Sequence, residues 1–477
     1  MKDFNYDNQE LRAEIKNVGK YWLQKGVDGF RLDAAKWIYN YGGVTDSADD
    51  TKNYAWWKEF YTYCQGVKSD VYMIGEVLVE NNIKDDRRYY QTGMDSNFNF
   101  EMRDVVYDAA RYASPNNYIN LLENFQTEIR GYNSKAIEAS CLSNHDIGRF
   151  YNFNGASYSE AQLALAGFLN ILAPGDSYVY YGEEIGLEGT ASGWTDMNYR
   201  TPMMFESGKT NPEKYFYGVP SKAASSSTKS GKTADAQAKA KDSLYAAYAK
   251  AIQAKNRNPI LYSGAVAKGG NGGNSEIGSF VVTEGGKSLT VVFNCGPSQK
   301  QITMDGSLAL VGESAFSGYS AVSGKILAMP AYSVAILDGK PTLVSVASDG
   351  TVPSESAPVE PTITATPDAF GSKVTAEKSG KLTLHCYDAA NWGSMKCYAW
   401  VDGGSTYLGG WPGAAMTKEE GNWFKIEIDH GASNVIFNNG SSQTVDLYRP
   451  EAGEYWFYPK KGGDKMSGDW YKVNPLA

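Results

Sequence analysis

Residues 27–33 read Val27-Asp28-Gly29-Phe30-Arg31-Leu32-Asp33, a short apolar run that ends on a carboxylate. The run predicts a strand, and an amphipathic helix over residues 11–25 precedes it. Similar segments recur along the first half of the chain: strands are expected at 71–74, 139–142 and 178–181, and helices at 56–66, 161–172 and 243–256. Strands that alternate with helices indicate βα units around a parallel sheet.

Acidic side chains follow several of these predicted strands. Asp33 ends the first strand, Glu76 follows the second, and His145 and Asp146 follow a third. Carboxyl ends of barrel strands face the active site in (β/α)8 enzymes. Glycoside hydrolysis needs an ionised carboxylate and a protonated one, roughly 5–5.5 Å apart in retaining enzymes. A third carboxylate can stabilise the developing positive charge.

The neighbours of these acids suggest how the roles divide. Arg31 lies two residues before Asp33, on the same face of the strand, where its charge keeps Asp33 ionised. Glu76 follows an apolar strand with no adjacent cation, and burial there favours the protonated acid. His145 is placed to bond sugar hydroxyls beside Asp146. Any one of these acids is equally a solvated strand cap or part of a structural ion pair, but three in order favour catalysis.

Three segments resemble signature regions of the α-amylase family, glycoside hydrolase family 13: residues 29–36, 75–77 and 142–146. The resemblance implies that Asp33 is the nucleophile, Glu76 the acid/base and Asp146 the transition-state stabiliser. It also implies a set of substrate contacts: Arg31, Lys36, Asn144, His145, Asp196 and Arg200. Lys36, Asp196 and Arg200 are also compatible with ordinary surface charges. Trp37 stands where amylases usually have His.

The first signature region of the family, an Asp-x-x-x-x-His segment, is absent from the sequence. We therefore expect a partial (β/α)8 barrel of about strands four to eight, lacking strands one to three and the domain after the third. The resemblance implies a structural Ca²⁺ whose ligands belong mostly to that missing part, and no metal ligand is assigned here. The chain is either a truncated record of a longer secreted enzyme or a genuine product, inert or completed by another polypeptide.

Changes in composition along the chain predict α/β architecture followed by all-β architecture. The expected divisions are a partial catalytic barrel at 1–259, an antiparallel β domain at 260–340, a Pro- and Ser-rich linker at 341–367, a starch-binding β-sandwich at 368–457 and a tail at 458–477.

The last module is rich in Trp and Tyr. Tyr398 and Trp400 project from one face of a strand, and Trp411 lies in a Gly-Trp-Pro-Gly turn. Their rings are either sandwich core or platforms for glucose rings. Together with the Phe-Asn-Asn-Gly segment they resemble starch-binding modules of family 26, which favours the second interpretation. The side chains of Asn439 and Gln443 are weaker candidates. A disulfide between Cys386 and Cys397 is left open.

Composition excludes several classes of function. Lys and Arg number 45 against 54 Asp and Glu, so the chain has no basic surface for nucleic acid. The apolar stretch 163–173 is about half a membrane span. Three His residues rule out a His-rich metal centre.

We expect a monomeric, secreted α-amylase that hydrolyses α-1,4-glucans such as starch. The alternatives are a non-catalytic starch-binding protein and an α-glucan transferase of the same family.

Overall fold

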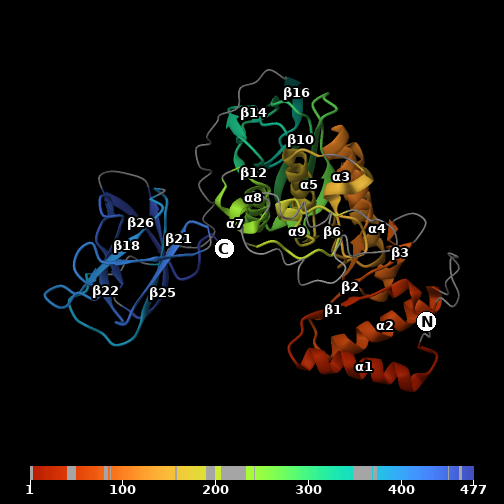
Figure 1. Cartoon of the computed structure of the whole chain (residues 1–477), viewed down its shortest axis with the longest axis horizontal. Helices are drawn as coiled ribbons and strands as arrows, with labels where there is room; N and C mark the ends of the chain where they lie inside the picture. Colours follow the sequence, from red (N-terminus) through yellow and green to blue (C-terminus); the bar gives the residue numbers. More distant parts are fainter. Residues whose placement is uncertain are drawn as a thin grey trace. The chain divides into compact units, whose positions relative to one another are not determined.

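The chain folds into two compact units, Met1–Val359 and Glu360–Ala477 (Figure 1). The computed structural model describes residues 4–39, 50–79, 84–85, 87–155, 158–189, 199–205, 233–240, 242–347, 368, 373–390, 392–419, 421–449, 451–460 and 465–476. Within these ranges, every helix is too short or too polar to cross a membrane.

A five-stranded parallel sheet forms the centre of the barrel part of the first unit. Its strands follow chain order: β1 (Gly29–Leu32), β2 (Tyr72–Gly75), β5 (Ser96–Asn99), β6 (Ala139–Cys141) and β7 (Asp176–Tyr178). All four pairings are parallel, so the carboxyl ends of the strands lie at one edge. The sheet curves enough for the Tyr72 hydroxyl on β2 to donate to Asp176 Oδ2 on β7 at 2.8 Å. This arrangement confirms the predicted arc of a (β/α)8 barrel.

Helices precede, connect and follow the strands of this arc. They are α1 (Gln9–Gln24), α2 (Asp50–Val67), α3 (Glu101–Tyr112), α4 (Asn116–Tyr132), α5 (Glu160–Leu172), α7 (Ala234–Lys239), α8 (Leu244–Arg257) and α9 (Ile260–Ser263). α5 begins with a capping box, in which the Ser159 hydroxyl accepts from the Gln162 amide and the Gln162 side chain accepts in return. Every residue of α5 from Gln162 to Leu172 is buried, as its apolar sequence predicts. A short hairpin, β3 (Leu78–Val79) and β4 (Lys84–Asp85), follows β2.

β5 is a strand that the sequence pattern does not predict. Its residues Ser96, Asn97 and Asn99 are polar, yet each is at most 1% exposed. The Ser96 hydroxyl donates to the Ile137 carbonyl at 2.9 Å, and the Tyr90 hydroxyl accepts from the Asn97 amide at 3.0 Å. Because buried polar side chains carry no apolar periodicity, the pattern that revealed the other strands is missing here.

Antiparallel strands follow the barrel part and confirm the predicted antiparallel β architecture. One sheet contains β8 (Ala265–Lys268), β9 (Ile277–Glu284), β10 (Lys287–Asn294), β12 (Leu310–Ala315) and β15 (Ser333–Asp338). The other contains β11 (Lys300–Met304), β13 (Ala321–Ser323), β14 (Ile326–Met329) and β16 (Leu343–Ala347). β16 pairs with β11, although its residues were expected to begin the linker.

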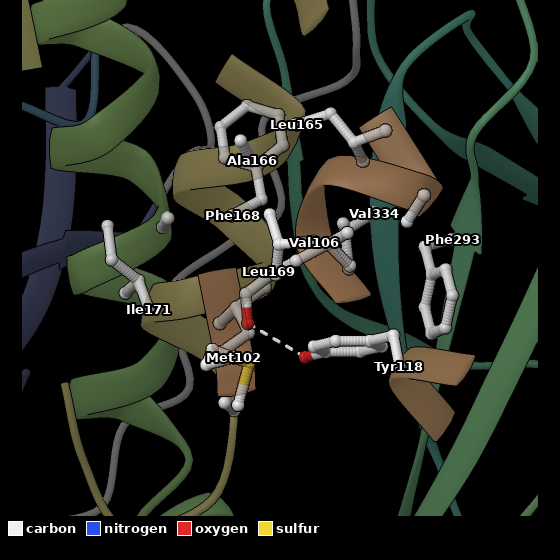
Figure 2. Close-up of a cluster of buried hydrophobic side chains, with 14 of the residues drawn as sticks. Met102, Val106, Tyr118, Leu165, Ala166, Phe168, Leu169, Ile171, Phe293 and Val334 are labelled. Carbon is white, nitrogen blue, oxygen red and sulfur yellow. Dashed lines mark hydrogen bonds between the residues drawn. The ribbon is translucent and has the colours of Figure 1, made fainter. Parts of the chain in front are cut away.

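This β domain shares a hydrophobic core with the barrel helices (Figure 2). Tyr118 on α4 donates its hydroxyl to the Leu169 carbonyl on α5 at 2.7 Å. Its ring meets Phe293 on β10 edge-on, with centroids 5.6 Å apart. The antiparallel domain therefore packs against the barrel helices on one side.

The second unit is a β-sandwich, as predicted. Its strands are β17 (Leu382–Tyr387), β18 (Lys396–Trp400), β19 (Ala414–Ala415), β20 (Thr417–Lys418), β21 (Trp423–Ile428), β22 (Ser433–Asn438), β23 (Gln443–Thr444), β24 (Leu447–Arg449), β25 (Gly453–Lys460) and β26 (Lys465–Tyr471). β26 pairs with β25 and β23, so the segment expected to form a tail is part of the sandwich. Trp470 of β26 is fully buried in its core, which explains why the strand is held there.

Candidate active site

The first two strands of the sheet bring Asp33 and Glu76 to the same edge. β1 and β2 are neighbours in register, with Arg31 opposite Ile74. Their pairing continues beyond the strands, because the Glu76 amide donates to the Leu32 carbonyl at 2.9 Å. Each carboxylate therefore projects from the residue directly after its strand.

Arg31 connects these two carboxylates. Its guanidinium contacts Asp33, and its Nη2 lies 3.1 Å from Glu76 Oε2. The expectation that Glu76 has no adjacent cation is wrong, because a cation on the neighbouring strand reaches it. The same Oε2 also accepts from the Ala34 amide at 3.1 Å. One arginine thus holds both carboxylates of the predicted catalytic pair in a single arrangement.

The two carboxylates differ in their exposure to solvent. The side chain of Asp33 is 76% exposed, whereas that of Glu76 is only 13% exposed. An open carboxylate can approach a substrate carbon, and an enclosed carboxyl group can deliver a proton to a bound leaving group. This asymmetry matches the roles that the sequence analysis expects for Asp33 and Glu76.

The chain turns sharply after Asp33 and places Lys36 differently from the prediction. Ala34 has a left-handed backbone with φ 44°, an unfavourable conformation for a residue with a side chain. The turn leads into a short 3₁₀ helix, Ala35–Trp37, which is held when Asn53 donates to the Lys36 carbonyl at 2.8 Å. Lys36 is consequently only 2% exposed, so the structure does not present it at an open surface where a sugar is bound.

Asp146 lies in a loop that follows β6, the strand two places from β2 in the sheet. Asn144 forms the turn, since its Oδ1 accepts from the amides of Asp146 at 2.8 Å and of Ile147 at 2.9 Å. His145 Nε2 lies 3.0 Å from Asp146 Oδ2. Arg200 reaches the same carboxylate with Nη2 at 2.6 Å and also donates from Nε to the His145 carbonyl.

Four of the predicted site residues therefore meet in this loop: Asn144, His145, Asp146 and Arg200. Asp196, the remaining predicted contact, lies outside the described residues. The sequence analysis missed Tyr199, whose hydroxyl donates to the Asp146 carbonyl at 3.1 Å. Its position next to Arg200 in the sequence was the available signal.

A buried glutamic acid and a buried arginine lie next to the Asp146 loop. Glu183 is fully enclosed, and burial raises its pKa to about 8 despite the nearby Ser143 and Arg149. Arg149 is only 1% exposed, and burial lowers its pKa.

The described residues contain no cluster of metal-donor side chains. Among the described residues, no group of three or more His, Cys, Asp or Glu side chains is arranged to hold a metal ion. The calcium implied by the family resemblance is therefore given no ligands here and no step in the chemistry.

A second candidate site lies on the β-sandwich. The rings of Tyr398 and Trp400 on β18 are stacked, with centroids 5.4 Å apart and planes 27° apart. Trp411 meets Tyr398 edge-on at 5.6 Å and is 51% exposed. Asn438 Nδ2 donates to the Pro412 carbonyl at 3.0 Å and so ties the Trp411 turn to β22. The three predicted residues thus form one aromatic cluster.

The weaker candidates of this module are engaged in its framework. Asn439 Oδ1 accepts from the amides of Ser441 and Ser442 and so shapes a turn. Gln443 pairs with Asn438 as part of β23.

A barrel arc whose strand ends carry an arginine-linked pair of carboxylates and a third, separately held carboxylate has the acidic groups that glycoside hydrolysis requires. The family description "Alpha amylase, catalytic domain" matches residues 1–264, and "Starch-binding module 26" matches residues 384–449. The chain belongs to the α-amylase family and carries a starch-binding module.

Individual relatives agree with this assignment. Alpha-amylase 3 of Dictyoglomus thermophilum is 36% identical over 269 residues, which are 56% of this chain and 50% of that protein. Alpha-amylase SusG of Bacteroides thetaiotaomicron is 30% identical over 63% of this chain and 44% of its own length. The chain thus spans about half the length of the curated relatives it matches.

Solved structures show the same fold. Eubacterium rectale Amy13B superimposes with a TM-score of 0.60 at 27% identity, covering 70% of this chain and 64% of that one. The alpha-amylase from H. orenii gives a TM-score of 0.58 at 26% identity, covering 70% and 65%.

Proposed function

We propose that this protein hydrolyses internal α-1,4-glucosidic bonds of starch-type glucans with retention of configuration. Asp33 attacks the anomeric carbon and forms a covalent glycosyl-enzyme, while Glu76 donates a proton to the departing oxygen. Glu76 then takes a proton from the water that attacks the anomeric carbon, which releases Asp33 and the sugar. Asp146 stabilises the positive charge that develops on the sugar ring.

The contact of Arg31 with both Asp33 and Glu76 is the observation that carries this proposal. It couples an exposed carboxylate to an enclosed one at the ends of adjacent parallel strands. We therefore expect the two acids to reach a single glycosidic bond. Asp146 approaches from a strand farther along the same edge, held by His145 and Arg200.

The remaining residues of the site would bind the glucan. Asn144, His145 and Arg200 border the open edge and are placed to meet sugar hydroxyls. Arg31 acts chiefly through the two carboxylates. Lys36 and Asp196 keep the roles that the family resemblance implies, although Lys36 must become accessible to contact a sugar.

The aromatic cluster of Tyr398, Trp400 and Trp411 would hold the protein on polymeric starch. Aromatic faces stack on the apolar faces of glucose rings, and such shallow sites bind in the roughly micromolar to millimolar range. The module raises the local concentration of substrate chains near the catalytic part, provided the two bind one particle together.

A glucan transferase of the same family is the second candidate. The 4-alpha-glucanotransferase of Thermotoga neapolitana is 28% identical over 39% of this chain. A transferase would use the same nucleophile and acid/base but would resolve the glycosyl-enzyme with a sugar hydroxyl. A third possibility is a starch-binding protein without catalysis.

One experiment separates these functions. The purified full-length chain is incubated with maltoheptaose, and new reducing ends and product lengths are followed over time. Hydrolysis supports the proposal if Glu76→Gln and Asp33→Asn each abolish it and Glu284→Gln, an exposed acid on β9, does not. Products longer than the substrate without new reducing ends indicate a transferase, and starch binding without turnover indicates a binding protein.

Retention is tested on the same reaction. Proton NMR of freshly released products distinguishes α-anomers from β-anomers before they equilibrate. An initial excess of β-anomers would contradict the covalent mechanism. We further propose that the protein is extracellular and monomeric. The Ca²⁺ that the family resemblance implies stays an expectation, with no ligands assigned among the described residues. Chelation followed by thermal unfolding tests that expectation.

A further inference from the structure

Two adjacent tyrosines form hydrogen bonds to the backbone on both sides of Arg200. Tyr180 and Tyr181 follow β7, and their hydroxyls point to the segment that carries this arginine. The Tyr180 hydroxyl donates to the Tyr199 carbonyl at 3.0 Å. The Tyr181 hydroxyl donates to the Thr201 carbonyl at 2.8 Å. Arg200 is therefore fixed at its main chain by bonds one residue before it and one residue after it.

The two tyrosines are themselves held by Arg149. The guanidinium carbon of Arg149 lies 4.7 Å from the centroid of each ring, and Nη1 donates to the Tyr181 carbonyl at 2.6 Å. Arg149 is nearly completely buried and comes three residues after Asp146. A low-dielectric setting of this kind strengthens a cation–π contact. The tyrosines are thus tied to the loop that carries Asp146.

These contacts form a closed cycle of interactions, called the contact ring below. It runs from Asp146 through its own loop to Arg149, then to the tyrosines, then to the backbone around Arg200, and returns to Asp146 through the 2.6 Å contact with Arg200 Nη2. We propose that Tyr180 and Tyr181 are positioning residues that hold Arg200 against Asp146. The inference rests on the proposed function for the catalytic role of Asp146.

The contact ring matters because the contact between Arg200 and Asp146 is open to solvent. Their side chains are 43% and 44% exposed. An ion pair this exposed contributes little to stability and does not by itself hold two flexible side chains in one geometry. Catalysis, in contrast, depends on a charge that is already in place when the transition state forms. The tyrosine hydroxyls supply the fixed backbone from which Arg200 can act.

The first test reads the geometry without relying on activity. Removing both hydroxyls in Tyr180→Phe/Tyr181→Phe releases the Arg200 segment but keeps the rings under Arg149. His145 reports the change, because its Nε2 lies 3.0 Å from Asp146 Oδ2 and its carbonyl accepts from Arg200. The sequence contains three histidines, and the other two, His385 and His430, belong to the second unit and serve as internal references.

Imidazole resonances of His145 are assigned with His145→Gln and compared in the full-length chain. We expect the His145 resonance to shift or broaden in the double variant while those of His385 and His430 stay in place. Tyr245→Phe, an exposed tyrosine on α8, is the matched control and should leave all three unchanged. An unchanged His145 resonance in a folded double variant overturns the proposal. If the double variant does not fold, Tyr180→Phe and Tyr181→Phe alone decide in the same way.

A double-mutant cycle separates positioning from general loosening of the loop. Arg200→Ala should displace the His145 resonance as the tyrosine variants do, and adding the tyrosine changes to Arg200→Ala should shift it little further. Independent, additive shifts would show that the tyrosines do not act through Arg200.

Kinetics supply the final arm. We expect kcat on maltoheptaose to fall about tenfold in the double variant with KM changed less than about twofold, since the lost interaction acts in the transition state. An unchanged kcat, or a rise in KM alone, overturns the positioning role. If the protein shows no turnover while its His145 resonance responds as expected, that result supports the contact ring and contradicts only the proposed function.

Discussion

The Nη2 atom of Arg31 lies 3.1 Å from the Oε2 atom of Glu76, although the two residues belong to different strands. The contact exists because β1 and β2 are parallel neighbours whose carboxyl ends coincide. The same guanidinium also contacts Asp33. The site is therefore organised around one shared cation.

Breaking this contact should destabilise the first unit. Arg31→Met leaves the largely enclosed Glu76 carboxylate without its cation, and we expect a loss of about 1 kcal/mol in the free energy of unfolding. The loss should be smaller in a Glu76→Gln background, where no charge needs compensation. Urea denaturation of the four proteins of this double-mutant cycle measures the coupling.

Arg111→Met is the control for that cycle, because it removes an exposed arginine of α3 without a catalytic contact. Its cost should be unaffected by Glu76→Gln. Equal costs of Arg31→Met in both backgrounds would contradict the shared-cation arrangement.

The buried carboxyl group of Glu138 predicts how stability depends on pH. Burial raises its pKa to about 8, against about 4.3 for an unfolded glutamate. Between these values the folded chain keeps a proton that the unfolded chain has released, so its contribution to stability falls as pH rises. The slope reaches roughly 1.4 kcal/mol per pH unit for one such group. Glu138→Gln should therefore flatten the decline of the unfolding free energy between pH 5 and 8.

Thermal unfolding at a series of pH values tests this prediction. Glu183, whose pKa is also raised to about 8, should leave a residual slope in Glu138→Gln. The exposed Glu284→Gln should follow the unmodified protein at every pH. A Glu138→Gln protein with the original slope would show that Glu138 is ionised in the fold.

The aromatic cluster of the module should determine starch affinity. Trp411→Ala and Trp400→Ala each remove one stacking surface, and we expect binding to granular starch to weaken about fivefold to tenfold. Trp456→Ala is the matched control, because this ring stacks on His385 at 4.5 Å and lies outside the cluster. Depletion assays with starch granules give the affinities. Equal losses in all three variants would place the binding surface elsewhere.

The five cysteines should behave as protected thiols. All five are buried, and none of them forms a disulfide, including Cys386 and Cys397. Burial raises the pKa of Cys64 to about 11 and those of Cys386 and Cys397 as well, so little reactive thiolate forms near neutral pH. Titration with a thiol reagent should find almost no reaction in the folded protein and five thiols after denaturation. Three thiols would instead reveal a Cys386–Cys397 disulfide.

Local pattern was enough to predict four of the helices, α1, α2, α5 and α8, and the apolar strands, but it did not reveal α3 and α4. The predicted helix at 161–172 and the observed α5 (Glu160–Leu172) almost coincide, because a continuous apolar surface and a Ser159 cap define it locally. The strand at 178–181 was placed too late, since β7 begins at the polar residue Asp176. β5 was missed for the related reason that its buried side chains are polar.

The identities of the candidate catalytic acids, and their order along the chain, can be read directly from the residues that follow each apolar strand. The contacts that these acids make with residues of other segments cannot be read in this way. Arg31 was assigned to Asp33 because spacing along one strand is visible in a sequence, whereas its contact with Glu76 arises only when two strands pair. Lys36 is enclosed because Ala34 turns the chain, and Tyr180 and Tyr181 meet the Arg200 segment only in the folded loop. Contacts between distant segments depend on packing, and packing is a property of the whole fold.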